Sequence, residues 1–274
     1  MIPMEDIYLL KFGGNAIGGR EDLDRLSGEI AGLVKEGAKI VLVHGGGPEI
    51  NAALEKKGIV PKKVAGLRIT DDTTMEVVEE TLKGINAGVV DSLTAAGVKA
   101  IGLPGYMVTV CRKKEPYTAL EDGKEVTVDL QNVGEVSETY VDTIEDLLSS
   151  GVTPVVYPIG ADDKGKHLNI NADTMASGIA AGLRCKEMIQ ITDVPGILLD
   201  INDPSSKQSL LTLSEVDELL AKGIISGGMV PKVEACRKAL DAGVAKVRMV
   251  NGKDPRSIVS DVMRSVDHGT VITK

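Results

Sequence analysis

Residues 38–51 read AKIVLVHGGGPEIN and decide the fold class. The stretch 38–44 is an apolar run of the length of one buried strand, and glycines follow it at 45–47. Pro48 suits the first turn of a helix, which we predict to continue to about Lys57. A buried strand, a glycine turn and a helix in succession are typical of a parallel sheet that helices cover on both faces.

The same unit recurs on both sides of this segment. Near the N-terminus, the apolar run IYLLKF (7–12) ends at Gly13 and Gly14, and Gly37 closes the helix that follows. Further strands are predicted at 99–103, 153–159, 187–192 and 245–250, and helices at 21–36, 71–86, 140–150, 171–183, 214–222, 229–242 and 255–264, with another ending at Gly97. We therefore predict an α/β fold, a three-layer αβα sandwich around a mostly parallel sheet.

The middle of the chain departs from this alternation. Between 106 and 138, β-branched and polar residues alternate around turn residues at 121–124, which predicts antiparallel hairpins. The polar segment GADDKG (160–165) is the best candidate for a boundary between two lobes, 1–165 and 166–274. The stretch GADDKGKH (160–167) nearly matches a phosphate-binding P-loop but lacks its final hydroxyl, so we predict a polar turn there.

Composition narrows the classes of function. The 274 residues carry a net charge of −9 and include five Tyr, one Phe and no Trp. An acidic, aromatic-poor chain is a poor partner for nucleic acid. Acidic residues stand where a signal peptide would be basic, and no apolar run has the length of a membrane span. The three cysteines lack metal-binding spacing and are typical of a reducing compartment, so we expect a cytoplasmic protein without a protein-bound metal.

Two glycine turns and three cations point to anionic ligands. Glycines after a strand let backbone N–H groups converge on an anion, and a following helix adds its positive end. Lys11 sits near the end of an apolar strand, where a charge needs a partner or a function. Lys232 begins a helix, where it either places a ligand or is simply a solvated surface residue. Arg68 suits a carboxylate clamp or an ion pair with Asp71 or Asp72.

Six segments in order make the chain similar to the amino acid kinase family, whose fold is carbamate kinase-like. They are KFGGNA (11–16), VLVHGGGPEIN (41–51), GLRITDDTTMEVV (66–78), LNINADT (168–174), ITDVPGIL (191–198) and GGMVPKVEAC (227–236). Within the family, the resemblance is to the members that phosphorylate N-acetyl-L-glutamate. It implies that ATP phosphorylates the side-chain carboxylate of that substrate, giving N-acetyl-L-glutamyl 5-phosphate in an early step of arginine biosynthesis.

The resemblance also implies roles for individual residues. Lys11 and Lys232 would stabilise the transferring phosphoryl group, and Asp173 would hold both lysines. Substrate-binding roles fall on Gly46, Gly47, Arg68 and Asn169, and nucleotide-binding roles on Gly13, Gly14, Asp193, Gly196, Leu198 and Ser226. ATP is expected with Mg²⁺, which phosphates and water would hold without a protein ligand. The first lobe would bind the acyl amino acid and dimerise, and the second would bind ATP.

Two other functions remain open at this point. A kinase of carrier-protein-linked aminoadipate or glutamate tends to have more arginines in the segment that reads VAGLRITDD (64–72) here. A non-catalytic nucleotide- or amino-acid-binding regulator on the same fold should have lost Lys11, Asp173 or Lys232.

Arginine-inhibited members carry an extra N-terminal helix that builds a hexamer. Only six residues precede the first predicted strand, so we expect a homodimer without strong arginine inhibition.

Overall fold

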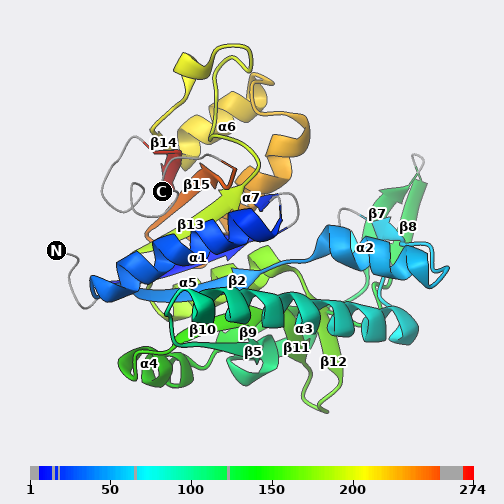
Figure 1. Ribbon diagram of the computed structural model, residues 1–274. Helices are drawn as coiled ribbons and strands as arrows, with labels where there is room; N and C mark the ends of the chain where they lie inside the picture. Colours follow the sequence, from blue (N-terminus) through cyan, green and yellow to red (C-terminus); the bar gives the residue numbers. More distant parts are fainter. Residues whose placement is uncertain (1–5, 14–15, 18, 65–66, 122–123, 254–267) are drawn as a thin grey trace.

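The computed structural model describes residues 6–13, 16–17, 19–64, 67–121, 124–253 and 268–274. Its main element is an eight-stranded sheet in the order β14-β16-β15-β13-β1-β2-β10-β5 (Figure 1). All neighbouring strands are parallel except β15 and β16. The strands are β1 (Ile7–Phe12), β2 (Lys39–His44), β5 (Ala100–Pro104), β10 (Thr153–Tyr157), β13 (Glu187–Thr192), β14 (Leu210–Thr212), β15 (Lys246–Asn251) and β16 (Thr270–Thr273).

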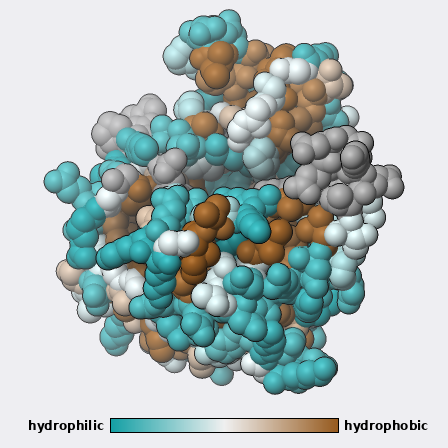
Figure 2. All heavy atoms as spheres, turned by 90° about the vertical axis from the view of Figure 1, so that its right-hand side faces the viewer, coloured by the Kyte–Doolittle hydropathy of each residue, from teal (hydrophilic) through white to brown (hydrophobic). Residues whose placement is uncertain are grey.

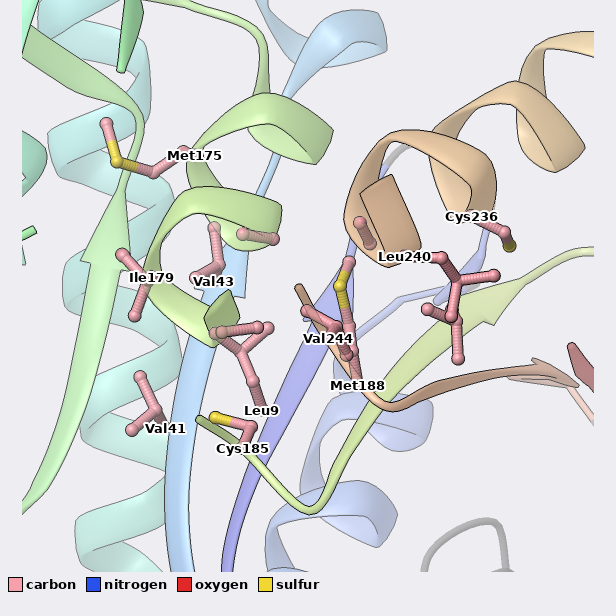
Figure 3. Close-up of a cluster of buried hydrophobic side chains, with 14 of the residues drawn as sticks. Leu9, Val41, Val43, Met175, Ile179, Cys185, Met188, Cys236, Leu240 and Val244 are labelled. Carbon is pink, nitrogen blue, oxygen red and sulfur yellow. The ribbon is translucent and has the colours of Figure 1, made fainter. Parts of the chain in front are cut away.

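Helices cover both faces of this sheet, which confirms the predicted αβα sandwich. The helices are α1 (Arg20–Lys35), α2 (Gly47–Lys56), α3 (Asp72–Ala95), α4 (Val141–Ser149), α5 (Ala172–Gly182), α6 (Leu213–Ala221) and α7 (Val230–Asp241). Successive strand residues point to opposite faces. Leu10 of β1 packs with α1 and α3, which cross in front of the strands in Figure 1. Leu9 packs on the other face with α5 and α7, in the cluster that Figure 3 shows.

A smaller sheet stands beside the main one and matches the irregular middle of the chain. Its order is β11 (Ile159–Ala161), β12 (His167–Ile170), β9 (Val133–Thr139) and β6 (Thr109–Lys113). The predicted hairpins are confirmed, because β6 pairs antiparallel with β9 and β7 (Tyr117–Glu121) pairs antiparallel with β8 (Lys124–Val128). Two further short strands, β3 (Lys63–Val64) and β4 (Leu67–Arg68), form a ribbon that carries Arg68.

Several element boundaries differ from the sequence predictions. The two helices expected at 71–86 and up to Gly97 are one helix, α3, which ends where Gly97 adopts a φ of +88°. The strand expected at 153–159 is interrupted at Pro158, so that β10 and β11 belong to different sheets. The polar turn at 160–165 is confirmed, since the Asp162 N–H donates to the Lys166 carbonyl between β11 and β12. The helix expected at 255–264 lies outside the described residues.

The surface that Figure 2 shows is largely hydrophilic, as expected for a chain rich in charged residues. Seen from the right-hand side of Figure 1, hydrophilic side chains cover much of the molecule, with hydrophobic patches in the upper part and across the middle (Figure 2). Within the described residues, none of the helices is both long and apolar enough to cross a lipid bilayer.

Residues 160–165 lie inside the smaller sheet, and the division into lobes there stays a prediction.

Candidate functional site

The centre of the site is an ion pair between Lys11 and Asp173. Lys11 is near the carboxyl end of β1, and Asp173 is in the first turn of α5, where the helix dipole favours an acid. Lys11 Nζ lies 2.6 Å from Asp173 Oδ1, and the two side chains are 16% and 29% exposed. Asn171 caps α5 by accepting from the backbone N–H groups of Asp173 and Thr174, so the local sequence NADT fixes the carboxylate at this point.

A cavity of about 250 Å³ opens on one side of this pair. Lys232 of α7 and Asp193, which follows β13, line it together with Lys11 and Asp173, and we call it the Lys232 cavity. Lys232 Nζ lies 3.0 Å from Asp193 Oδ1. The Lys232 ammonium also holds the pKa of Asp193 below its ordinary value. Lys232 therefore lines the cavity with an acidic partner and is more than a solvated surface residue.

One expected contact differs from the prediction. Asp173 was expected to hold both lysines, but the structure pairs it with Lys11, while Lys232 pairs with Asp193. The reason is the position of Asp193, which leaves β13 next to the first turn of α7 and offers Lys232 a closer carboxylate. In this arrangement each lysine has its own acidic partner at the wall of the same cavity.

A second cavity, of about 330 Å³, opens on the other side of the ion pair. Arg68, Asn169 and the glycines at 45–47 line it, and we call it the Arg68 cavity. It shares Lys11, Gly13 and Asp173 with the Lys232 cavity. The ion pair therefore lies where the two cavities meet, so that groups bound in the two cavities would face each other across Lys11.

Arg68 brings a buried cation to the wall of this second cavity. Its side chain is buried, with 8% exposed, and burial lowers the pKa of its guanidinium. Nη2 donates to Asn51 Oδ1 at 2.6 Å, while Nη1 is buried without a hydrogen-bond partner. The alternative ion pair does not form, because Asp71 caps α3 and Asp72 lies 3.1 Å from Lys166. A guanidinium that lines a cavity and forms no ion pair with a carboxylate of the described residues fits a bound carboxylate.

The glycine turns after β1 and β2 touch each other beside the ion pair. A Cβ on Gly13 would lie 2.9 Å from the Cα and the N of Gly45, which is closer than side chains approach backbone. The Gly45 N–H donates to the Phe12 carbonyl at 2.8 Å. Gly13 is thus required to be glycine by packing, and Gly46 is packed against the ends of Leu82 and Ile85. The two turns form one backbone surface that lines both cavities.

His44 is hydrogen-bonded to the second glycine turn, and no role was predicted for it from the sequence. It ends β2, is fully buried, and burial lowers its pKa from 6.5 to about 4. A neutral ring fits its contacts, in which Nδ1 donates to the Gly45 carbonyl at 2.8 Å and Nε2 accepts from Asn86 Nδ2 at 3.1 Å. The position of a polar residue between an apolar strand and a glycine turn was the signal that could have identified it.

The remaining predicted residues fall into three groups. Asn169 lines the Arg68 cavity, where its Nδ2 donates to Thr70 Oγ1 at 3.1 Å. Three residues follow β13 or precede α7 without lining either cavity, and their nucleotide-binding role stays a prediction: Gly196, Leu198 and Ser226. Gly14 lies outside the described residues.

Cations and backbone donors dominate the chemistry of the site. In the part of the chain that the structure describes, there is no group of three His, Cys, Asp or Glu side chains that could hold a metal ion. The lysines, Arg68 and the glycine turns can neutralise two anionic ligands that approach each other. Such an arrangement suits transfer of a charged group between them, because catalysis of phosphoryl transfer depends on positioning and on charge stabilisation.

Comparison with known proteins agrees with this geometry. Residues 6–251 match the model of the amino acid kinase family. The chain is 42% identical over 271 residues to the acetylglutamate kinase of Methanocaldococcus jannaschii, covering 98% of this chain and 90% of that protein. It is 42% identical over 268 residues to the acetylglutamate kinase of Archaeoglobus fulgidus, covering 96% and 92%.

Solved structures share the fold over nearly the whole chain. The protein smu.665 from Streptococcus mutans superposes with a TM-score of 0.75 at 27% identity, covering 98% of this chain and 99% of that one. A Giardia carbamate kinase superposes with a TM-score of 0.70 at 20% identity, with the same coverage. The ordered segments, the sandwich and the matched length agree, and the chain belongs to the amino acid kinase family.

Proposed function

We infer that this protein is an acetylglutamate kinase. It transfers the γ-phosphoryl group of ATP to the side-chain carboxylate of N-acetyl-L-glutamate, giving N-acetyl-L-glutamyl 5-phosphate and ADP in an early step of arginine biosynthesis. Relatives of that name at about 40% identity over nearly the full length support this activity. The observation that carries it is the Lys11–Asp173 pair at the junction of two cavities, one of which is lined by the Arg68 guanidinium.

The reaction needs charge neutralisation more than proton transfer. The attacking carboxylate has a reference pKa of about 4.3 and is already ionised at neutral pH, so no general base is required. One carboxylate oxygen forms a bond to the γ-phosphorus as the bond to the leaving ADP oxygen breaks. Lys11 stabilises the negative charge on the oxygens of the transferring phosphoryl group. Asp173 keeps the Lys11 ammonium beside those oxygens.

The Arg68 cavity is the proposed place of the acyl amino acid. The Arg68 guanidinium, which lines this cavity and has one nitrogen without a hydrogen-bond partner, is proposed to bind the α-carboxylate, and the amide of Asn169 lines the same cavity for the N-acetyl region. The N–H groups of Gly46 and Gly47 are proposed to contact the reacting carboxylate and the phosphoryl oxygens. Gly47 is the first residue of α2, whose positive end adds to this field.

The Lys232 cavity is the proposed place of the ATP phosphates. Lys232 would turn from Asp193 towards the β- and γ-phosphates, a short change for a long side chain that is 27% exposed. Mg²⁺ is proposed to arrive with ATP and to be held by phosphates and water, where it would neutralise phosphate charge. Most of the Arg68 cavity comes from residues before 165, while Asp193 and Lys232 follow it, which supports the proposed division into an acyl-amino-acid lobe and an ATP lobe.

Two further properties are proposals. The three cysteines are free and buried, which suits a reducing compartment, and we propose a cytoplasmic location. We also propose a homodimer, dimerising through the first lobe, without strong arginine inhibition. Light scattering with and without arginine tests the assembly, and a hexamer would contradict it.

A hydroxylamine trap tests the activity. An acyl phosphate reacts with hydroxylamine to give a coloured hydroxamate, so the assay reports carboxylate phosphorylation directly. We expect a signal with ATP, Mg²⁺ and N-acetyl-L-glutamate, and much weaker signals with N-acetyl-L-aspartate, L-glutamate and N-acetyl-L-aminoadipate. A signal only with a carrier-linked aminoadipate or glutamate would contradict the substrate, and ATP binding without any hydroxamate would contradict the enzyme.

A further inference from the structure

A buried glutamine interrupts the apolar strand at the centre of the sheet. β13 reads EMIQIT, and Gln190 is 2% exposed between Ile189 and Ile191. An amide placed there costs free energy unless its polar atoms are hydrogen-bonded, and an aliphatic side chain would fill the strand without that cost. Gln190 pairs in register with Lys11 of the neighbouring β1. Its polarity is therefore unexplained by packing, and its position is beside the reacting centre.

Both ends of the Gln190 amide are bonded, each to a different part of the fold. Nε2 donates to Asp173 Oδ1 at 3.1 Å, and Oε1 accepts from Cys236 Sγ of α7 at 3.2 Å. Asp173 Oδ1 thus receives the amide as well as Lys11 Nζ, which lies 2.6 Å away. One carboxylate oxygen held by two donors from neighbouring strands has a fixed position.

Cys236 and Asp173 together determine which way the amide points. It is fully buried on α7, among the residues that Figure 3 labels, and burial raises its pKa, so the thiol keeps its proton. A protonated thiol donates to the carbonyl end of Gln190 and leaves the NH₂ end for Asp173. The reversed amide would place an oxygen against the carboxylate. The thiol therefore favours the same orientation as the carboxylate, the one that holds Asp173.

We propose that Gln190 is a positioning residue for phosphoryl transfer, oriented by Cys236 and acting through Asp173 on Lys11. This inference rests on the proposed function and adds residues that do not touch the phosphoryl group. An amide that fixes the carboxylate keeps the Lys11 ammonium aimed at the oxygens on which charge develops. Its contribution therefore belongs to the chemical step more than to the binding of either substrate.

Replacement of the glutamine gives the first test. Gln190→Leu removes both hydrogen bonds at similar volume, and we expect kcat to fall about 10- to 100-fold, since hydrogen bonds to charged groups contribute about 1.5–3 kcal/mol and about 1.4 kcal/mol is tenfold. The KM values of both substrates should stay within about threefold. A purely structural role would lower the melting temperature and leave kcat per folded molecule as in the wild type, which would overturn the proposal.

The thiol gives a second test if Gln190→Leu does not fold. Cys236→Ala removes the donor that orients the amide and should lower kcat several-fold, whereas Cys236→Ser keeps a hydroxyl donor and should recover most of that loss. Cys185→Ala is the matched control, because Cys185 is also buried in the core and lies outside the two cavities. Equal kcat values for Cys236→Ala, Cys236→Ser and Cys185→Ala would overturn the orienting role.

A crystal structure of Gln190→Leu separates this inference from the proposed function. We expect the Asp173 carboxylate to turn and its distance to Lys11 to change, and that result stands even if the wild type phosphorylates another substrate. An unmoved Lys11–Asp173 pair in the variant would overturn the inference. Absence of hydroxamate from the wild-type enzyme would instead contradict the proposed function.

Discussion

Arg68 offers the sharpest quantitative prediction about substrate binding. Arg68 is 8% exposed and lines the cavity, its Nη2 donates to Asn51, and its Nη1 is buried without a hydrogen-bond partner. Arg68→Met keeps an apolar side chain of similar length and removes both the positive charge and the hydrogen-bond donors of the guanidinium group. A buried charge pair that loses one partner costs about 2–5 kcal/mol, and about 1.4 kcal/mol corresponds to a factor of ten. We therefore expect kcat/KM for N-acetyl-L-glutamate to fall at least about 30-fold.

The structure also predicts how Arg68→Met changes the KM values of the two substrates and the stability of the protein. The KM of N-acetyl-L-glutamate should rise, while the KM of ATP should change by less than about threefold, because Arg68 lines only the acyl-amino-acid side of the ion pair. In the wild type, the buried Nη1 without a partner destabilises the folded state, whereas the hydrogen bond to Asn51 stabilises it, each by about 1–3 kcal/mol. Because the variant loses both contributions, chemical denaturation should give a free energy of unfolding within about 1 kcal/mol of the wild-type value.

Initial rates in the hydroxamate assay measure these quantities, and Arg112→Met is the matched control. Arg112 is 70% exposed, pairs with Glu135 and lies outside both cavities. Its replacement should leave the KM of N-acetyl-L-glutamate within about twofold of wild type. If Arg68→Met folds normally and also keeps that KM, the assignment of the cavity to the substrate carboxylate is refuted.

Three further predictions concern the rest of the site. Lys232→Ala should lower kcat about 100-fold or more with only a small rise in the KM of ATP, because its stabilisation is greatest in the transition state; unchanged kcat would remove it from the catalytic set. Gly13→Ala should lower kcat/KM by separating the glycine turns, whereas Gly32→Ala, with no neighbour within 4 Å of its Cβ, should keep wild-type kinetics. His44 binds protons more readily in the unfolded chain, since its pKa is about 4 when folded against 6.5, so about 3 kcal/mol of stability should disappear as the pH falls from 6.5 to 4. His44→Asn should flatten that part of a denaturation series against pH, and an unchanged slope would contradict the assignment.

The sheet, most of the covering helices and the central ion pair could be predicted from the sequence. Apolar runs such as IYLLKF and AKIVLVH are long enough to identify strands without any knowledge of their neighbours. Lys11 was identifiable because a charge in such a run requires an explanation. The break at Pro158 and the short strands β14 and β16 were not identifiable, since pairing with distant strands stabilises them more than local pattern does.

The missed functional residues have a similar cause. Gln190, Cys236 and His44 are buried, and each acquires its role from a hydrogen bond to a residue more than 15 positions away or from the geometry of a turn. A single sequence does not reveal which buried polar groups meet. The Lys232–Asp193 pair was not predicted for the same reason, because Asp173 and Asp193 are both acids in matching motifs and only the fold shows which of them Lys232 contacts.

One measurement tests the central claim most directly, namely that Lys11 stands between the two substrates. It is a crystal structure of the wild-type protein with Mg²⁺, ADP, aluminium fluoride and N-acetyl-L-glutamate. We predict that the fluoride group lies within about 3 Å of Lys11 Nζ, with the nucleotide in the Lys232 cavity and the substrate carboxylate on Arg68. A phosphoryl mimic bound away from Lys11, or both ligands in the same cavity, would contradict the account.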